Sequence, residues 1–135
     1  MISVVVDTNV IVSALLAKRE DSPTVKILRA IMGGLLRPLH SPEILDEYRE
    51  VLSRAEFHFN QSAVDCVIQR FREIGLDLSP AESDGTFPDP DDKVFYCVAL
   101  AAQDEKAKLV TGNIRHYPQA DFVVTPAELC RIASL

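Results

Sequence analysis

The sequence lacks the features that mark membrane-spanning, exported and nucleic-acid-coating proteins. None of its apolar runs is long enough to span a bilayer, and the N-terminus has no basic stretch followed by a cleavable apolar segment. We therefore expect a cytoplasmic protein that does not associate with membranes. Asp and Glu outnumber Lys and Arg by 20 to 14, and this balance argues against coating nucleic acid through bulk electrostatics. It leaves open an enzyme that touches nucleic acid at one local patch.

Cysteines are few and widely spaced. The three of them, Cys66, Cys97 and Cys130, form no CxxC pair, so the sequence supports neither a zinc site nor a disulfide framework. Each lies in a helix-like pattern, where a buried free thiol behaves as a small hydrophobic group. We expect all three to be structural.

The rest of the composition is typical of a globular chain, with 47% hydrophobic and 25% charged residues. We expect a single domain over residues 1–135, long enough to bury a core without crosslinks. Short apolar runs alternate with segments of helical periodicity, and this alternation predicts an α/β fold around a mostly parallel sheet. The expected strands cover residues 4–6, 35–39, 76–78, 107–111 and 122–124. The expected helices cover residues 10–16, 23–32, 62–74 and 92–103, with two more beginning after Ser41 and Thr125.

The first strand runs directly into a carboxylate. Val4, Val5 and Val6 form the continuous apolar run of a fully buried parallel strand, and Asp7 follows them. In open α/β sheets, ligands bind beyond the carboxyl ends of the strands, so Asp7 stands where such a fold builds a site. The alternative is that Asp7 only caps the helix starting near Val10, a role that Asp often takes.

Glu47 is the acid of the helix after Pro42 that lies at the margin of the apolar stripe, between Ile44 and Val51. A carboxylate in that position loses hydration unless it is paired or bound to a metal ion. The alternative is a half-exposed side chain that reaches solvent or an arginine.

Two more polar positions are predicted at the same edge of the sheet. Asp91 and Asp92 stand at the entrance of the most apolar helix, and we expect one of them to cap it, Asp91 more than Asp92. Asp92 shares a helix face with Phe95, which aims it inward at the rim. Asn113 follows the fourth strand as Asp7 follows the first, although a turn of this composition is common.

If the α/β prediction holds, four polar side chains meet on one rim of the sheet: Asp7, Glu47, Asp92 and Asn113. Oxygen ligands without a cluster of His or Cys select a hard cation, Mg²⁺ or Mn²⁺. Such an ion can activate water and stabilise charge on a phosphoryl group. Metal-dependent phosphodiester hydrolysis is the simplest reaction that matches this set of residues.

Four segments spread over nearly the whole chain carry a family resemblance: VVVDTNVIVSALL, SPEILDEYREVL, DPDDKVFYCVALAA, and LVTGN followed by IRHYP. In this order they resemble the PIN domain, the small nuclease fold of VapC-type toxins in toxin–antitoxin pairs. Each motif is weak alone, whereas the four together are specific. The sequence looks most similar to the branch described as toxin-component PIN proteins.

The resemblance implies a three-layer α/β/α domain that holds one or two Mg²⁺ or Mn²⁺ ions and cleaves single-stranded RNA. By motif position, it implies metal-binding and catalytic roles for Asp7, Glu47 and Asp92. Thr8 and Ser41 match small hydroxyl positions near these acids. Asn113 stands where the family commonly has an aspartate; its amide can still offer an oxygen, but one negative charge is lost and a second metal ion should bind more weakly.

The resemblance also implies a cognate antitoxin and a homodimer formed through helices. Phosphate contacts from basic side chains would position RNA rather than read its sequence. The candidates near the predicted rim are Lys18, Arg19, Arg54, Lys93, Arg115 and His116. For each of them a solvated surface role is the alternative.

Two other functions stay open. A degenerate PIN domain would bind RNA or a protein partner without cleaving; Asn113 favours this function, and the retained acids oppose it. A metal phosphatase or receiver-like domain is the third possibility. Receiver domains carry paired acids near the first strand, where this chain has Val5 and Val6.

Overall fold

The computed structural model describes residues 1–135 and contains a five-stranded sheet in the order β3-β2-β1-β4-β5. The strands are β1 (Ile2–Val6), β2 (Leu36–His40), β3 (Leu76–Asp77), β4 (Lys108–Val110) and β5 (Val123–Val124). All four neighbouring pairs are parallel. The predicted α/β fold with a mostly parallel sheet of about five strands is therefore confirmed.

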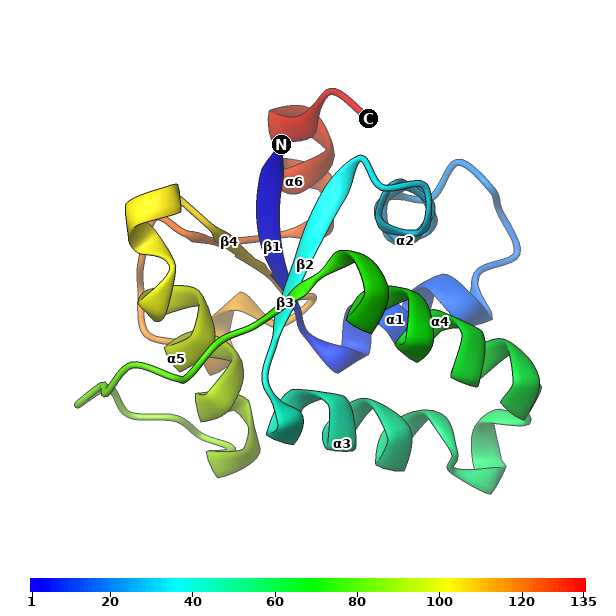
Figure 1. Ribbon diagram of the computed structural model, residues 1–135, viewed down its shortest axis with the longest axis horizontal. Coiled ribbons are helices and arrows are strands. Elements are labelled where there is room, and N and C mark those ends of the chain that lie inside the picture. The colour runs from blue at the N-terminus through cyan, green and yellow to red at the C-terminus, as the bar shows by residue number, and fades with distance from the viewer.

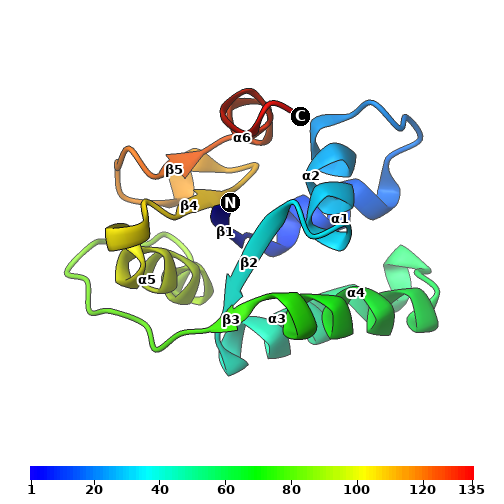
Figure 2. The same ribbon diagram turned by 45° about the horizontal axis from the view of Figure 1, so that its top comes forward.

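Helices cover both faces of this sheet (Figure 1). They are α1 (Thr8–Leu16), α2 (Pro23–Met32), α3 (Pro42–Leu52), α4 (Gln61–Ile74), α5 (Lys93–Ala101) and α6 (Pro126–Ala133). Figure 2 shows α5 on one side of the strands and α1, α2 and α4 on the other, which gives the three layers α/β/α. None of the helices combines the length and the apolar character that crossing a membrane requires.

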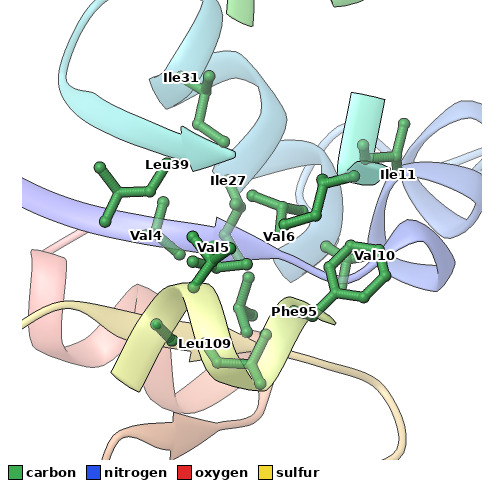
Figure 3. Packing of buried hydrophobic residues seen from close by; sticks show 14 of the residues in the cluster. Val4, Val5, Val6, Val10, Ile11, Ile27, Ile31, Leu39, Phe95 and Leu109 are labelled. Atoms are coloured by element: carbon green, nitrogen blue, oxygen red, sulfur yellow. The ribbon is translucent and has the colours of Figure 1, made fainter. Parts of the chain in front are cut away.

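The core explains why residues 4–6 form the central strand. The side chains of Val4, Val5 and Val6 are at most 1% exposed. Figure 3 shows Ile27 of α2 on one side of β1 and Phe95 of α5 on the other. Branched apolar side chains suit a strand that is covered on both faces, so this run of valines sets the middle of the sheet.

Helix α3 closes the carboxyl end of the sheet from outside the layers. It begins directly after β2, and Figure 1 shows it running beyond the ends of the strands. The hydroxyl of its buried Tyr48 donates to the carbonyl oxygen of Val6 at 2.6 Å. This bond fixes α3 against the last residue of β1, beside the point where Asp7 begins.

Two expectations about helices need correction. Residues 92–103 do not form one helix, because α5 is flanked by the 3₁₀ turns Pro90–Asp92 and Gln103–Glu105. Cys66 is exposed, since it lies on α4 outside the buried stripe that contains Val64 and Val67; the thiols of Cys97 and Cys130 are buried.

The strand order reverses between β1 and β4. From β1 the chain proceeds outward through β2 to β3, then crosses back to β4 on the other side of β1. In a parallel sheet, the connections that leave the two central strands then diverge, and the crevice beyond their carboxyl ends is where such folds bind ligands. Asp7 follows β1 and Thr111 follows β4, so this crevice begins between these two residues.

Candidate active site

Asp7 does not act as a helix cap. It occupies the residue position before α1, but its side chain makes no capping hydrogen bond. Its Oδ2 instead accepts hydrogen bonds from Thr111 Oγ1 at 2.8 Å, Tyr117 Oη at 2.8 Å and Asn9 Nδ2 at 3.3 Å. Oδ1 accepts none of these bonds. Asp7 is only 6% exposed, so its carboxylate is fixed by donors in the crevice rather than by the helix backbone.

Thr111 and Tyr117 are the residues of this site that the sequence did not reveal. They reach Asp7 across 104 and 110 residues of chain. The place of Thr111 directly after the fourth strand was one available indication. Tyr117 gave none, because only the tertiary fold brings the turn after β4 over the end of β1.

Asp92 lies in the same crevice as Asp7. Its side chain is 16% exposed, and Nδ1 of His116 lies 3.5 Å from its Oδ2. Burial raises the pKa of Asp92 to about 6, with further contributions from the charges of Asp7 and Asp89, whereas His116 lowers it. The structure therefore brings Asp7 and Asp92 close enough for their negative charges to repel each other.

The expectation that Asp91 or Asp92 caps the following helix is wrong. Asp92 makes no capping hydrogen bond to α5. Asp89 instead caps the 3₁₀ turn that precedes α5, because its Oδ1 accepts from the backbone N–H of Asp91 at 3.0 Å. The reason is that a 3₁₀ turn beginning at Pro90 precedes α5, so the side-chain cap is made at the start of that turn while Asp92 occupies the position before α5 without capping it. Asp91 is exposed, and the carboxylate of Asp92 is left free for the crevice.

Glu47 is half-buried on α3, as its position at the margin of the stripe predicted. Burial raises the pKa of Glu47, and the charges of Asp91 and Glu50 raise it further. Glu47 and Asp91 both line an open groove of about 670 Å³ that neither Asp7 nor Asp92 lines. The charged residues of this groove are Glu43, Glu47, Glu82, Asp84, Asp91 and Lys93. Glu47 is thus grouped with Asp91, beside the pair formed by Asp7 and Asp92.

The hydroxyl groups predicted near the acids have different environments. Ser41 Oγ caps α3 by accepting from the backbone N–H of Ile44 at 3.3 Å. Thr8 Oγ1, next in the chain to Asp7, is buried and has no hydrogen-bond partner. Asn113 is exposed, and its backbone N–H donates to Thr111 Oγ1 at 3.0 Å.

The basic candidates differ in how free they are to meet a phosphate. Arg19 is paired with Asp21 and Arg54 with Glu50, and both pairs lie on the surface. Lys18 is exposed, and Lys93 lies in the acidic groove. Arg115 and His116 are exposed on the 3₁₀ turn after β4, and Arg115 makes no ion pair. His116 borders the crevice beside Asp92, and Arg115 precedes it on the same turn.

The side chains of the crevice fit a hard divalent cation. No group of three or more His, Cys, Asp or Glu side chains is gathered closely enough to hold a metal ion alone. Mg²⁺, however, is usually bound through one or two carboxylates and keeps several waters. A cation between Asp7 and Asp92 would relieve their repulsion, and Thr8, the residue after Asp7, has a buried hydroxyl without a hydrogen-bond partner. Oxygen donors of this kind select Mg²⁺ or Mn²⁺ over softer ions.

Comparison with known proteins agrees with the geometry. A protein-family model described as PIN domain matches residues 3–115, a range that contains all the acids of the crevice and of the neighbouring groove. No curated protein and no solved structure gives a significant match to the chain.

Proposed function

The chain belongs to the PIN-domain family, a nuclease fold, and on this basis we propose that it is a metal-dependent ribonuclease cleaving single-stranded RNA. The observation that carries the proposal is the pair of carboxylates at the strand-order reversal. Asp7 and Asp92 repel each other there, and the one basic side chain paired with either acid is the exposed His116, beside Asp92. An acid whose pKa is raised in a crevice, as that of Asp92 is, is typical of catalytic sites.

Asp7 and Asp92 would hold the cation, Mg²⁺ or Mn²⁺, and Glu47 would complete the catalytic set from α3. When bound, the cation supplies charge neutralisation at a phosphoryl group and activation of water. Asp7 would offer its Oδ1 in a fixed direction, because Thr111 and Tyr117 donate hydrogen bonds to its Oδ2. Thr8 offers its free hydroxyl to water or to the cation. Tyr48 keeps α3, and with it Glu47, against the end of β1.

The charge distribution indicates from which side the RNA backbone would arrive. The groove beside Glu47 is lined by five acids and one lysine, and a phosphate would be repelled there. Arg115 and His116 lie on the turn after β4 and do not line that groove. We propose that phosphates cross the turn of Arg115 and His116 and reach Asp7 and Asp92 from that side.

We also propose that the protein is the toxin of a toxin–antitoxin pair and forms a homodimer. The support is the family resemblance to VapC-type toxins. Size-exclusion chromatography with light scattering should give a dimer mass, and a clean monomer would end the dimer proposal.

The alternative is a degenerate domain that binds RNA without cutting it. The exposed Asn113 in place of an acid favours that alternative, since it removes one charge near the crevice. Incubation of a mixed RNA pool with the protein separates the two functions. The ribonuclease should cut RNA with Mn²⁺ and stop with a chelator, and an Asp7→Asn preparation should not cut. Retention of uncut RNA in a gel shift would establish the binding function instead.

A further inference from the structure

The carboxylate of Asp7 is held asymmetrically. Oδ2 accepts three hydrogen bonds, from Thr111, Tyr117 and Asn9, whereas Oδ1 accepts none. Two of the donors are hydroxyls at 2.8 Å, a normal length for a strong bond to a carboxylate. A carboxylate that is hydrogen-bonded through one oxygen has little freedom to rotate, so its other oxygen points in a defined direction.

The ring and backbone of Tyr117 are held by contacts other than the one to Asp7. Tyr117 is 6% exposed, and its ring packs parallel to Tyr96 with centroids 6.5 Å apart and edge-on to Phe87 at 6.3 Å. Its backbone N–H donates to the carbonyl oxygen of Ile114 at 3.1 Å, which closes the 3₁₀ turn. Aromatic packing and the turn therefore hold the Tyr117 ring so that its hydroxyl meets Asp7.

Thr111 is oriented in a similar way. Its Oγ1 accepts the backbone N–H of Asn113 at 3.0 Å, and this bond leaves the hydroxyl proton directed to Asp7. The two strong donors to Oδ2 are thus Thr111, directly after β4, and Tyr117, at the end of the turn that follows. Tyr117 is the one whose hydroxyl can be removed while its ring stays.

We infer that Tyr117 is a positioning residue for Asp7: its hydroxyl, with that of Thr111, occupies Oδ2 and presents Oδ1 to the divalent cation. This inference rests on the proposed function. Hydrogen-bonding partners behind metal ligands commonly change metal affinity or activity by 10–100-fold when they are removed. Tyr117 is buried and its hydroxyl is bonded to Asp7, so in this inference it acts through the carboxylate.

Tyr117→Phe tests the inference, with Tyr96→Phe as the matched control. Both rings lie in the same aromatic cluster, but the Tyr96 hydroxyl makes no hydrogen bond within the protein. We expect Tyr117→Phe to weaken Mn²⁺ binding, measured by calorimetry without RNA, by about 10-fold or more. We expect it to lower kcat at limiting Mn²⁺ and to leave KM for RNA unchanged. Tyr96→Phe should match the wild type in all three quantities, and thermal unfolding should show both variants folded.

Two results would overturn the inference while leaving the proposed function intact. One is wild-type Mn²⁺ affinity in Tyr117→Phe; the other is an equal loss in Tyr96→Phe, which would mean that ring packing alone matters. A wild-type protein that binds no Mn²⁺ would overturn the proposed function, and this inference with it.

Discussion

The carboxylate of Asp92 makes the cation-free protein less stable at neutral pH. Its pKa is raised from 3.8 to about 6 by burial and by the charges of Asp7 and Asp89. Above pH 6 the Asp92 carboxylate is ionised in a crevice that disfavours its charge, whereas in the unfolded chain the same charge is exposed to water. A shift of this size corresponds to about 3 kcal/mol, and partial exposure and relaxation reduce it.

Asp92→Asn should therefore stabilise the cation-free protein at pH 8 by about 1–2 kcal/mol. The sign follows from the raised pKa: between pH 4 and pH 6 the folded state holds the proton that the unfolded state has released, so wild-type stability falls as pH rises. Below pH 4 both states are protonated, and the two proteins should converge. Urea unfolding of the wild type and of Asp92→Asn, with a chelator present, measures the stability difference at pH 4 and at pH 8. A gap that stays constant with pH would contradict this explanation.

Asn113 is the second residue whose charge can be tested directly. It is exposed beside Thr111, and an acid there would add a negative charge near the crevice. We expect Asn113→Asp to raise Mn²⁺ affinity by about fivefold, since a charge near the surface contributes on the order of 1 kcal/mol. Calorimetry measures the change, with Asn60→Asp at the cap of α4 as the control. No rise in affinity would remove Asn113 from the site.

At the scale of elements, the turn from α4 into β3 depends on the absence of a side chain. A Cβ on Gly75 would lie 2.4 Å from the carbonyl oxygens of Phe71 and Pro38, and 2.8 Å from Nε2 of His40. Two of these atoms are backbone and cannot swing away. This close approach lets α4 end where β3 pairs with β2, which completes the edge of the sheet.

Gly75→Ala should destabilise the protein by about 1–3 kcal/mol, as overpacking does in a close-packed interior. Gly112→Ala is the matched control, because its Cβ would meet nothing nearer than 3.5 Å. Urea unfolding should separate the two variants clearly. Equal stability of Gly75→Ala and the wild type would show that the turn can open without cost.

The helix that enters the crevice shows where sequence patterns stop being sufficient. The apolar character of residues 92–103 predicted a buried helix, and α5 is the shorter, buried part of that span. The cap could not be predicted, because Asp89, Asp91 and Asp92 are equivalent by residue type. Only the 3₁₀ turn at Pro90 decides that Asp89 makes the capping hydrogen bond and that Asp92 makes none.

For the whole molecule, local patterns predicted the elements, and the long-range contacts remained hidden. The run of valines and the alternation of strands and helices were enough to predict the parallel sheet and to place Asp7 at the carboxyl end of its central strand. The order of strands is set by packing, and it brings Thr111 and Tyr117 to Asp7 across more than 100 residues. Periodicity also could not show that Glu47 faces Asp91 in a separate groove.

The overall charge of −6 is consistent with a local site rather than a nucleic-acid-coating surface. Five of the acids line the groove beside α3, and the exposed side chains of Arg115 and His116 lie after β4. Affinity for RNA should then depend on the bound cation as well as on these two side chains.

The most direct test of the central claim is the rate of Mn²⁺-dependent RNA cleavage by Asp7→Asn and Asp92→Asn. Asp46→Asn, an exposed acid paired with Arg49 on the outer face of α3, is the control. Loss of one group that stabilises transition-state charge costs about 100-fold or more. We predict a loss of that size in both site variants and a wild-type rate in the control. Unchanged cleavage by both Asp7→Asn and Asp92→Asn would contradict the account.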